Sequence, residues 1–165
     1  MLSIKLGDIT KENTEAIVNA ANSRLAGGGG VDGAIHKAAG PEILKECSKI
    51  EGCPTGDARI TGAGKLKAKH IIHAVGPVWH GGSCNESQLL KSAYEKCFIL
   101  AKENGLRSIS FPAISTGVYK YPIEEAALIA LSMGKKYEND FQEIRYICFS
   151  KKDYDVYRKV SSSIK

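Results

Sequence analysis

The 165-residue sequence contains no apolar run that approaches the roughly 18 residues of a transmembrane helix. Its beginning, MLSIKLGDIT, has no apolar segment followed by a cleavage site, so no signal peptide is visible. These two absences predict a soluble, cytoplasmic protein with no membrane partner.

The sequence also lacks any CxxC pair, although it contains five cysteines. An odd number of scattered cysteines in such a chain argues against a disulfide framework. We therefore expect free thiols at all five positions: Cys47, Cys53, Cys84, Cys97 and Cys148.

Basic residues are not concentrated anywhere along the chain, although the net charge is +5. An extended nucleic-acid surface needs clustered basic or aromatic side chains, so a nucleic-acid partner is not expected. The net positive charge weakly favours an anionic ligand.

Alternating strands and helices fill most of the chain. Strands are predicted at 3–6, 16–18, 57–61, 69–75, 108–113 and 145–149. Helices are predicted at 31–50, with an interruption near Gly40-Pro41, and at 88–103, 122–137 and 153–164. The pattern predicts one α/β domain over 1–165 with three layers, α/β/α, around a mixed, largely parallel sheet. The first strand is expected at an edge, and an antiparallel direction is open for it.

Two polar, glycine-containing loops each follow a predicted strand. The first joins Asn19–Asn22 to the four glycines Gly27–Gly30, and the second runs from Ile114 to Tyr119. In open α/β sheets, ligands bind outside the carboxyl ends of strands. Glycine N–H groups and a helix N-terminus together favour phosphate oxygens. Two facing loops suit a diphosphate better than a single phosphate. The alternative interpretation is that the glycine run forms a flexible surface loop.

The other candidate motifs lack the neighbouring strands, helices or ligand partners that their functions would require. Gly28–Gly33 matches G-x-G-x-x-G, but its glycines do not follow the strand at once, which argues against a dinucleotide fold. No P-loop and no Gly-x-Ser-x-Gly elbow is present. His70 and His73 point to opposite faces of a strand, and His36 and His80 have no partner at ligand spacing. Trp79 is expected to be a packing residue.

Taken together, these segments resemble the macro domain family, and within it the MacroD-type ADP-ribose hydrolases. The matching segments occur in the family's order: Gly7–Thr10, Ala16–Asn22, Gly27–His36, Ala38–Pro41, His73–Pro77, Phe111–Tyr119 and Cys148–Ser150. The resemblance implies a three-layer α/β/α fold that binds ADP-ribose without a metal or other cofactor.

The resemblance also implies roles in ligand binding. Asp8 would accept a hydrogen bond from the adenine amino group, the Ile9 N–H would meet a ring nitrogen, and Phe149 would stack on adenine. The alternatives are a turn-forming Asp8 and a Phe149 in the core. Tyr119 would pack beside the distal ribose. The residues expected to bind the diphosphate are Gly30, Val31, Ser115, Thr116, Gly117 and Val118. Gly28 and Gly29 are also expected to bind the substrate.

Asn22 and Asp32 match the family's residues at the distal ribose. Asn22 would orient the sugar, and Asp32 would orient or deprotonate a water near the anomeric carbon. Helix capping is the alternative role of Asp32. Because a carboxylate of ordinary pKa is a weak base at neutral pH, the substrate's own phosphate could activate the water instead. Lys120 replaces the family's frequent glycine, and the first loop has no Cys or His, so no zinc is expected.

The resulting hypothesis is a monomeric hydrolase that removes mono-ADP-ribose from Asp or Glu side chains of proteins. O-acetyl-ADP-ribose is a further expected substrate. One alternative is a reader that binds ADP-ribose without cleaving it. Another is a regulator of RNA processing that uses the same pocket for an adenine nucleotide.

Overall fold

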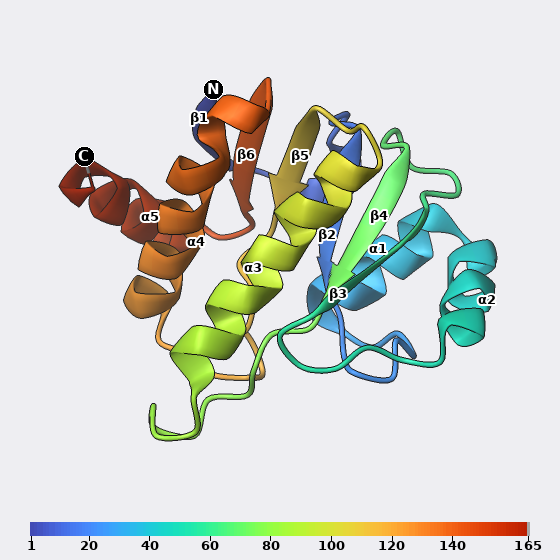
Figure 1. The fold of residues 1–165 in the computed structure, drawn as a ribbon, viewed down its shortest axis with the longest axis horizontal. Helices are drawn as coiled ribbons and strands as arrows, with labels where there is room; N and C mark the ends of the chain where they lie inside the picture. Colours follow the sequence, from blue (N-terminus) through green and yellow to red (C-terminus); the bar gives the residue numbers. More distant parts are fainter. Residues whose placement is uncertain (165) are drawn as a thin grey trace.

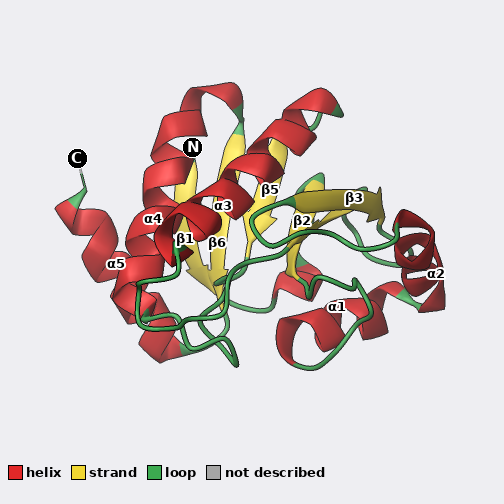
Figure 2. Ribbon diagram, turned by 60° about the horizontal axis from the view of Figure 1, so that its bottom comes forward, coloured by secondary structure: helices red, strands yellow, loops and turns green. Residues whose placement is uncertain are grey.

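A computed structural model describes residues 1–164 and places a six-stranded sheet between two layers of helices (Figures 1 and 2). The strand order is β1-β6-β5-β2-β4-β3. The strands are β1 (Leu2–Leu6), β2 (Ala16–Ala20), β3 (Ala58–Gly62), β4 (His70–Ala74), β5 (Ser108–Phe111) and β6 (Glu143–Cys148). The mixed α/β architecture predicted from the alternation of elements is confirmed.

Within residues 1–164, five α-helices cover the sheet. They are α1 (Gly30–Ala39), α2 (Pro41–Ile50), α3 (Glu86–Glu103), α4 (Ile123–Tyr137) and α5 (Lys151–Ser163). Short 3-10 turns lie at Ile9–Lys11 (η1) and Glu138–Asp140 (η2). The interruption predicted near Gly40 separates α1 from α2, because Gly40 has a φ of +99° and Pro41 begins the next helix. Within the described residues, no helix is both long and apolar enough to span a membrane.

A hydrophobic core lies on each face of the sheet, which explains why the central strands are rich in consecutive apolar residues. Ile17 and Ile71 pack with α1 and α2 on one face, whereas their neighbours Val18 and Ile72 pack with α3, α4 and α5 on the other. Successive side chains of a strand point to opposite faces, so a sheet covered on both sides has apolar residues at most positions of its central strands. Burying each such side chain contributes about 1.5–3 kcal/mol.

The direction of the first strand differs from the antiparallel alternative considered from the sequence. β1 lies at an edge as expected, but it runs parallel to β6, with Leu2 opposite Ile144 and Leu6 opposite Cys148. The antiparallel strand is β3, which pairs with β4. Because a short connection can only join antiparallel neighbours, β3 and β4 are constrained locally. β1 and β6 come from opposite ends of the chain, so nothing local sets their relative direction.

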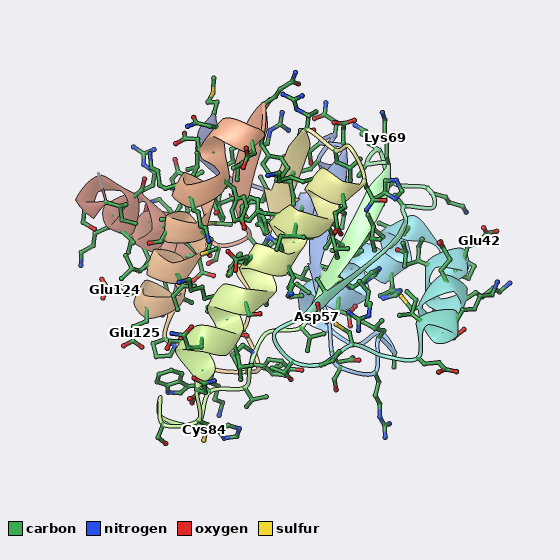
Figure 3. The ribbon with its side chains drawn as sticks, viewed as in Figure 1. Glu42, Asp57, Lys69, Cys84, Glu124 and Glu125 are labelled. Atoms are coloured by element: carbon green, nitrogen blue, oxygen red, sulfur yellow. The ribbon has the colours of Figure 1, made fainter. Side chains whose placement is uncertain are left out.

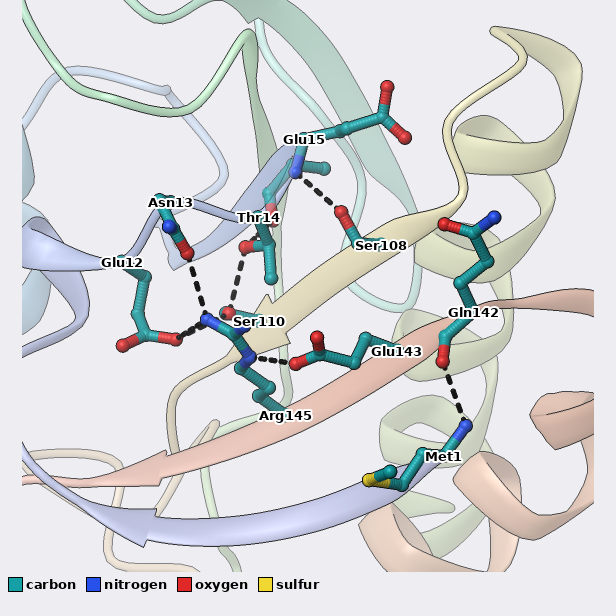
Figure 4. A network of polar contacts seen from close by, with 11 residues as sticks. Met1, Glu12, Asn13, Thr14, Glu15, Ser108, Ser110, Gln142, Glu143 and Arg145 are labelled. Atoms are coloured by element: carbon teal, nitrogen blue, oxygen red, sulfur yellow. Dashed lines mark hydrogen bonds and ion pairs between the residues drawn. The ribbon is translucent and has the colours of Figure 1, made fainter.

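A polar network ties the amino ends of the strands together (Figure 4). Arg145 of β6 donates to Glu12 and Asn13 at 3.0 Å each and forms an ion pair with Glu143. Ser110 of β5 donates to the same Glu12 carboxylate at 3.1 Å. These bonds fix the segment before β2 against β5 and β6, and they leave the opposite, carboxyl edge of the sheet to the two glycine-containing loops.

Candidate functional site

The first loop runs from the end of β2 to the first turn of α1. Gly30, the first residue of α1, has a φ of +58°, and a Cβ at this position would meet no atom within 4 Å. The first N–H groups of a helix have no partner inside the helix and carry its positive dipole end. An anion is therefore favoured beside Gly29 and Gly30.

The second loop follows β5, which pairs with β2 in the sheet. Its turn is closed by the Tyr121 N–H, which donates to the Ser115 carbonyl at 2.9 Å, and Ser115 adopts a φ of +68°. The Ile114 N–H donates to the Tyr94 hydroxyl of α3 at 3.4 Å. A Cβ at Gly76, after β4, would collide with the Ser115 side chain. The loop thus fits its place only because position 76 is glycine.

The two loops enclose a cavity of about 430 Å³. Predicted site residues that line it are Asn22, Gly28, Gly29, Gly30, Val31, Asp32, Ser115, Gly117, Val118 and Tyr119. Residues that sequence reasoning did not assign also line it: Ala20, Ala21, Gly76, Ala113 and Ile114. Gly76 follows a third strand end, and that position was the available signal for it. Thr116, Asp8, Ile9 and Phe149 are not among the lining residues.

Asp32 and Asn22 both lie close to Gly28. A Cβ built at Gly28 would lie 3.4 Å from Asp32 Oδ2 and 3.9 Å from Asn22 Nδ2. The Asn22 amide also shapes its own loop, because Nδ2 donates to the Gly27 carbonyl at 2.8 Å and Oδ1 accepts from the Ala26 N–H at 3.1 Å. One carboxylate oxygen and one amide nitrogen therefore both lie beside Gly28, in the first loop.

The other carboxylate oxygen of Asp32, Oδ1, is held by side chains of β2 and α1. Oδ1 accepts from Asn19 Nδ2 at 2.8 Å and lies 3.2 Å from His36 Nε2, one turn further along α1. Asn19 Nδ2 also lies 3.1 Å from Nδ1 of the buried His73. Because a carboxylate can only accept, the amide nitrogen must face Asp32, and Nδ1 of His73 is then the acceptor. These contacts fix the Asp32 carboxylate and leave Oδ2 directed at the loop.

The protonation state of His73 follows from its surroundings. Burial, followed by the charge of neighbouring His36, lowers the pKa of His73 to about 4. His73 Nε2 donates to Thr61 Oγ1 at 2.9 Å, which in turn donates to the Gly62 carbonyl. His73 is therefore neutral at pH 7, with its hydrogen on Nε2. The sequence analysis gave Asn19 and His73 no role beside Asp32, because no local sequence pattern shows which partner a buried polar side chain in a strand will contact.

A second group of predicted residues lies at the ends of β1 and β6. The Gly7 N–H donates to the Cys148 carbonyl at 2.9 Å, which brings Asp8 and Phe149 to neighbouring strand ends. Asp8 Oδ1 accepts from the Thr10 hydroxyl at 2.7 Å and N–H at 3.0 Å, and these bonds lower the pKa of Asp8. Asp8 is thus a capping residue in this structure. Phe149 is 82% exposed, so the alternative of a core residue is wrong.

A third segment, residues 76–85, supports the second loop from the side. Trp79 packs against Tyr121 with 4.7 Å between ring centroids, as expected of a packing residue. The backbone N–H of Trp79 donates to the Tyr119 carbonyl at 2.8 Å. The buried carboxylate of Glu86 accepts from the backbone N–H groups of His80, Gly82 and Cys84 at 2.6–3.0 Å. Cys84 lies at the bottom of Figure 3, in the segment that leads into α3.

Replacing Glu86 with glutamine is expected to lower Tm by several degrees at pH 7. Burial alone would raise the pKa of Glu86 from its usual 4.5, but backbone N–H groups, those of His80, Glu86 itself, Gly82 and Cys84, lower it to about 2. A carboxyl with a depressed folded-state pKa stabilises the protein above its unfolded pKa, and this contribution disappears as pH falls through the folded pKa. The Tm difference should therefore shrink between pH 4.5 and pH 2. Thermal unfolding across this range measures it.

The exposed Glu103→Gln substitution at the other end of α3 is the control, and it should leave Tm nearly unchanged. A Tm difference between Glu86→Gln and the original protein that is the same at pH 7 and pH 2 would contradict this role of the Glu86 charge.

Within residues 1–164, all five cysteines are free thiols, as expected. The structure also brings together His36, Cys47 and His73, which are far apart in the sequence. The expectation that His36 has no partner for binding a metal is therefore wrong. Its neighbours Cys47 and His73 lie on α2 and β4, and a search for ligand spacing along the sequence could not find them.

These features define a three-layer α/β/α domain with a two-loop site at the carboxyl edge of its sheet. A family model described as Macro domain matches residues 18–130. The chain belongs to the macro domain family.

Known proteins similar to this chain match it over nearly its whole length. The O-acetyl-ADP-ribose deacetylase 1 of Pantoea vagans is 52% identical over 166 aligned residues, which cover 96% of this chain and 97% of that protein. A structure of the Oceanobacillus iheyensis macrodomain with ADP superimposes with a TM-score of 0.94 at 48% identity, covering 98% of this chain and 90% of that one. A Trypanosoma brucei macrodomain in complex with ADP-ribose gives 0.92 at 41% identity, with 97% and 68% covered.

Proposed function

We propose that this protein binds ADP-ribose and hydrolyses the ester that joins mono-ADP-ribose to Asp or Glu side chains of proteins. O-acetyl-ADP-ribose, an ester on the same sugar, is proposed as a second substrate. The observation that carries the proposal is that Asp32 and Asn22 both line the cavity between the two loops, with Asp32 Oδ2 and Asn22 Nδ2 each within 4 Å of a Cβ position at Gly28. The solved relatives with ADP and ADP-ribose support the ligand, and the deacetylase names support the reaction.

Binding would use the backbone of both loops. Gly30 at the N-terminus of α1 and Gly117 in the second loop line the same cavity, and the backbone N–H groups of the two loops would hold the two phosphates. The adenine would lie toward Asp8 and the exposed ring of Phe149, at the ends of β1 and β6. The distal ribose would then lie against Tyr119 and the Asp32 carboxylate.

Hydrolysis needs a water aligned with the anomeric carbon of the distal ribose. The water oxygen forms a bond to that carbon as the carbon–oxygen bond to the protein carboxylate breaks, and the carboxylate leaves. Asp32, fixed through Oδ1 by Asn19, would orient the water through Oδ2 and accept its proton or pass it to the neighbouring phosphate. Asn22 would keep the ribose in register by bonding a hydroxyl group.

The proposal is tested with a protein substrate that carries mono-ADP-ribose on glutamate. We expect release of free ADP-ribose, together with saturable binding of ADP-ribose in calorimetry. Binding without release would make the protein a reader of ADP-ribose. Absence of both would refute the proposed ligand. A steep salt dependence of RNA binding, with no ADP-ribose binding, would instead favour the RNA-processing alternative.

Turnover is expected to survive EDTA. The proposed reaction uses only Asp32, Asn22 and the backbone of the loops, so removing divalent ions should leave the rate of ADP-ribose release the same or higher. The rate is measured before and after dialysis against the chelator. A loss of activity that added metal restores would show that the hydrolysis needs a metal.

A further inference from the structure

We propose that His36, Cys47 and His73 form a binding site for a borderline-soft transition metal ion, with Zn²⁺ as its natural occupant, and that metal binding there reduces hydrolysis. The effect on hydrolysis rests on the proposed function, whereas the metal site does not. The sequence predicted no zinc because the first loop holds no Cys or His. The group proposed here is assembled from α1, α2 and β4, below the cavity.

The geometry of the three side chains fits a small ion. One ring nitrogen of each histidine and Cys47 Sγ lie within 4.8 Å of one another, and Cys47 Sγ is 3.8 Å from His73 Nε2. Around tetrahedral zinc, neighbouring N and S ligands are separated by roughly 3.3–3.6 Å, given bonds of about 2.0–2.3 Å. Each ligand atom therefore needs only a small inward movement. Two imidazoles and one thiolate are the ligand set that Zn²⁺ and Co²⁺ accept, with water in the fourth position.

His36 has one ring nitrogen that is free to bind a metal. Its Nε2 lies 3.2 Å from Asp32 Oδ1, whereas its Nδ1 is buried and has no hydrogen-bond partner within residues 1–164. The carboxylate favours the hydrogen on Nε2, which leaves a buried, unpaired lone pair on Nδ1. A carboxylate beside the other ring nitrogen is a common feature of histidines that bind metals. His36 is also the member of the group that is partly open to solvent, so an ion can enter past it.

Cys47 and His73 must change protonation when the ion binds. Cys47 binds as the thiolate and releases its proton to solvent. Burial, followed by the charges of Asp32 and Glu46, raises the pKa of Cys47 to about 11, so the free site holds a thiol. His73 binds through Nε2 and moves its hydrogen to Nδ1, which gives up the hydrogen bond to Thr61.

Moving the ring hydrogen of His73 to Nδ1 also affects Asp32, because Asn19 contacts both side chains. In the metal-free protein, Asn19 Nδ2 donates to both His73 Nδ1 and Asp32 Oδ1. Once His73 Nδ1 carries a hydrogen, Asn19 must turn its oxygen toward it, and this oxygen is buried without a partner in the described structure. The turned amide can no longer donate to Asp32. Metal binding therefore removes the bond that fixes the proposed catalytic carboxylate, and we infer that hydrolysis falls.

Metal binding is tested directly with Co²⁺, which takes the ligands of Zn²⁺ and gives a thiolate-to-metal absorption band in the near ultraviolet. Protein freed of metal with EDTA is titrated with Co²⁺ in the absence of ADP-ribose. We expect a band that saturates at one ion per chain and disappears when Zn²⁺ is added. Cys47→Ser should abolish the band, with its fold checked by circular dichroism and Tm.

Two cysteine variants are the controls. Cys53→Ser removes another buried thiol, and Cys84→Ser removes the exposed thiol, and both should keep the band. Absence of a band in the original protein, or an unchanged band in Cys47→Ser, would overturn the metal site.

Hydrolysis is then measured with saturating Zn²⁺. We expect loss of most ADP-ribose release in the original protein and little change in Cys47→Ser. Equal inhibition of both proteins would overturn the regulatory effect. A saturating, Cys47-dependent band in a protein that never hydrolyses any substrate would keep the metal site and refute the proposed function, so the two failures can be distinguished.

Discussion

Replacing Asp32 with alanine should lower the rate of ADP-ribose release by about 10²- to 10⁴-fold, the usual contribution of a positioned general base. The affinity for ADP-ribose should change by less than about tenfold, because the diphosphate is held by backbone N–H groups that the substitution leaves in place. Single-turnover release from a glutamate-linked substrate gives the rate, and calorimetry gives the affinity.

Asp32 also lies in the first turn of α1, where an acidic side chain stabilises the helix. Glu42→Ala is therefore the matched control, because Glu42 occupies the first turn of α2 and is exposed on the outer side of the molecule (Figure 3). We expect Glu42→Ala to retain full turnover. Full turnover in Asp32→Ala would remove Asp32 from the mechanism and leave it as an acidic residue that stabilises the first turn of α1.

Replacing Gly30 with glutamate should weaken ADP-ribose binding by at least about 100-fold, since opposing like charges at an interface costs several kcal/mol. The new side chain would project from the cavity wall toward the expected phosphates, and a Cβ at Gly30 meets no protein atom within 4 Å. The substitution thus places a carboxylate in the ligand's space and does not create a clash within the protein. Calorimetric titration of ADP-ribose measures the effect.

Gly105→Glu is the matched control for backbone strain. Gly105 has a φ of +70°, also has open space around a Cβ, and follows α3 on the side where β5 begins, at the amino edge of the sheet. Both substitutions force a side chain into the left-handed region, but only Gly30→Glu alters the cavity. Similar affinities in the two variants would refute the placement of the phosphates at the first loop.

Local patterns in the sequence determined which segments are strands and helices. Alternation of strands and helices predicted an α/β/α domain, and Gly40-Pro41 predicted the break between α1 and α2. The strand-then-loop order placed both glycine-containing loops at one edge of the sheet. These inferences succeed because hydrophobic periodicity, turn residues and helix ends depend on neighbours a few positions away.

Only the tertiary structure decided which strands are neighbours. β5 beside β2 brings the second loop against the first, and β1 beside β6 brings Asp8 near Phe149 and fixes the parallel direction of β1. The bonds from Asn19 to Asp32 and His73, and the group of His36, Cys47 and His73, join residues from separate elements. Pairing between distant segments and the partners of buried polar groups depend on the whole fold, so no local pattern in the sequence encodes them.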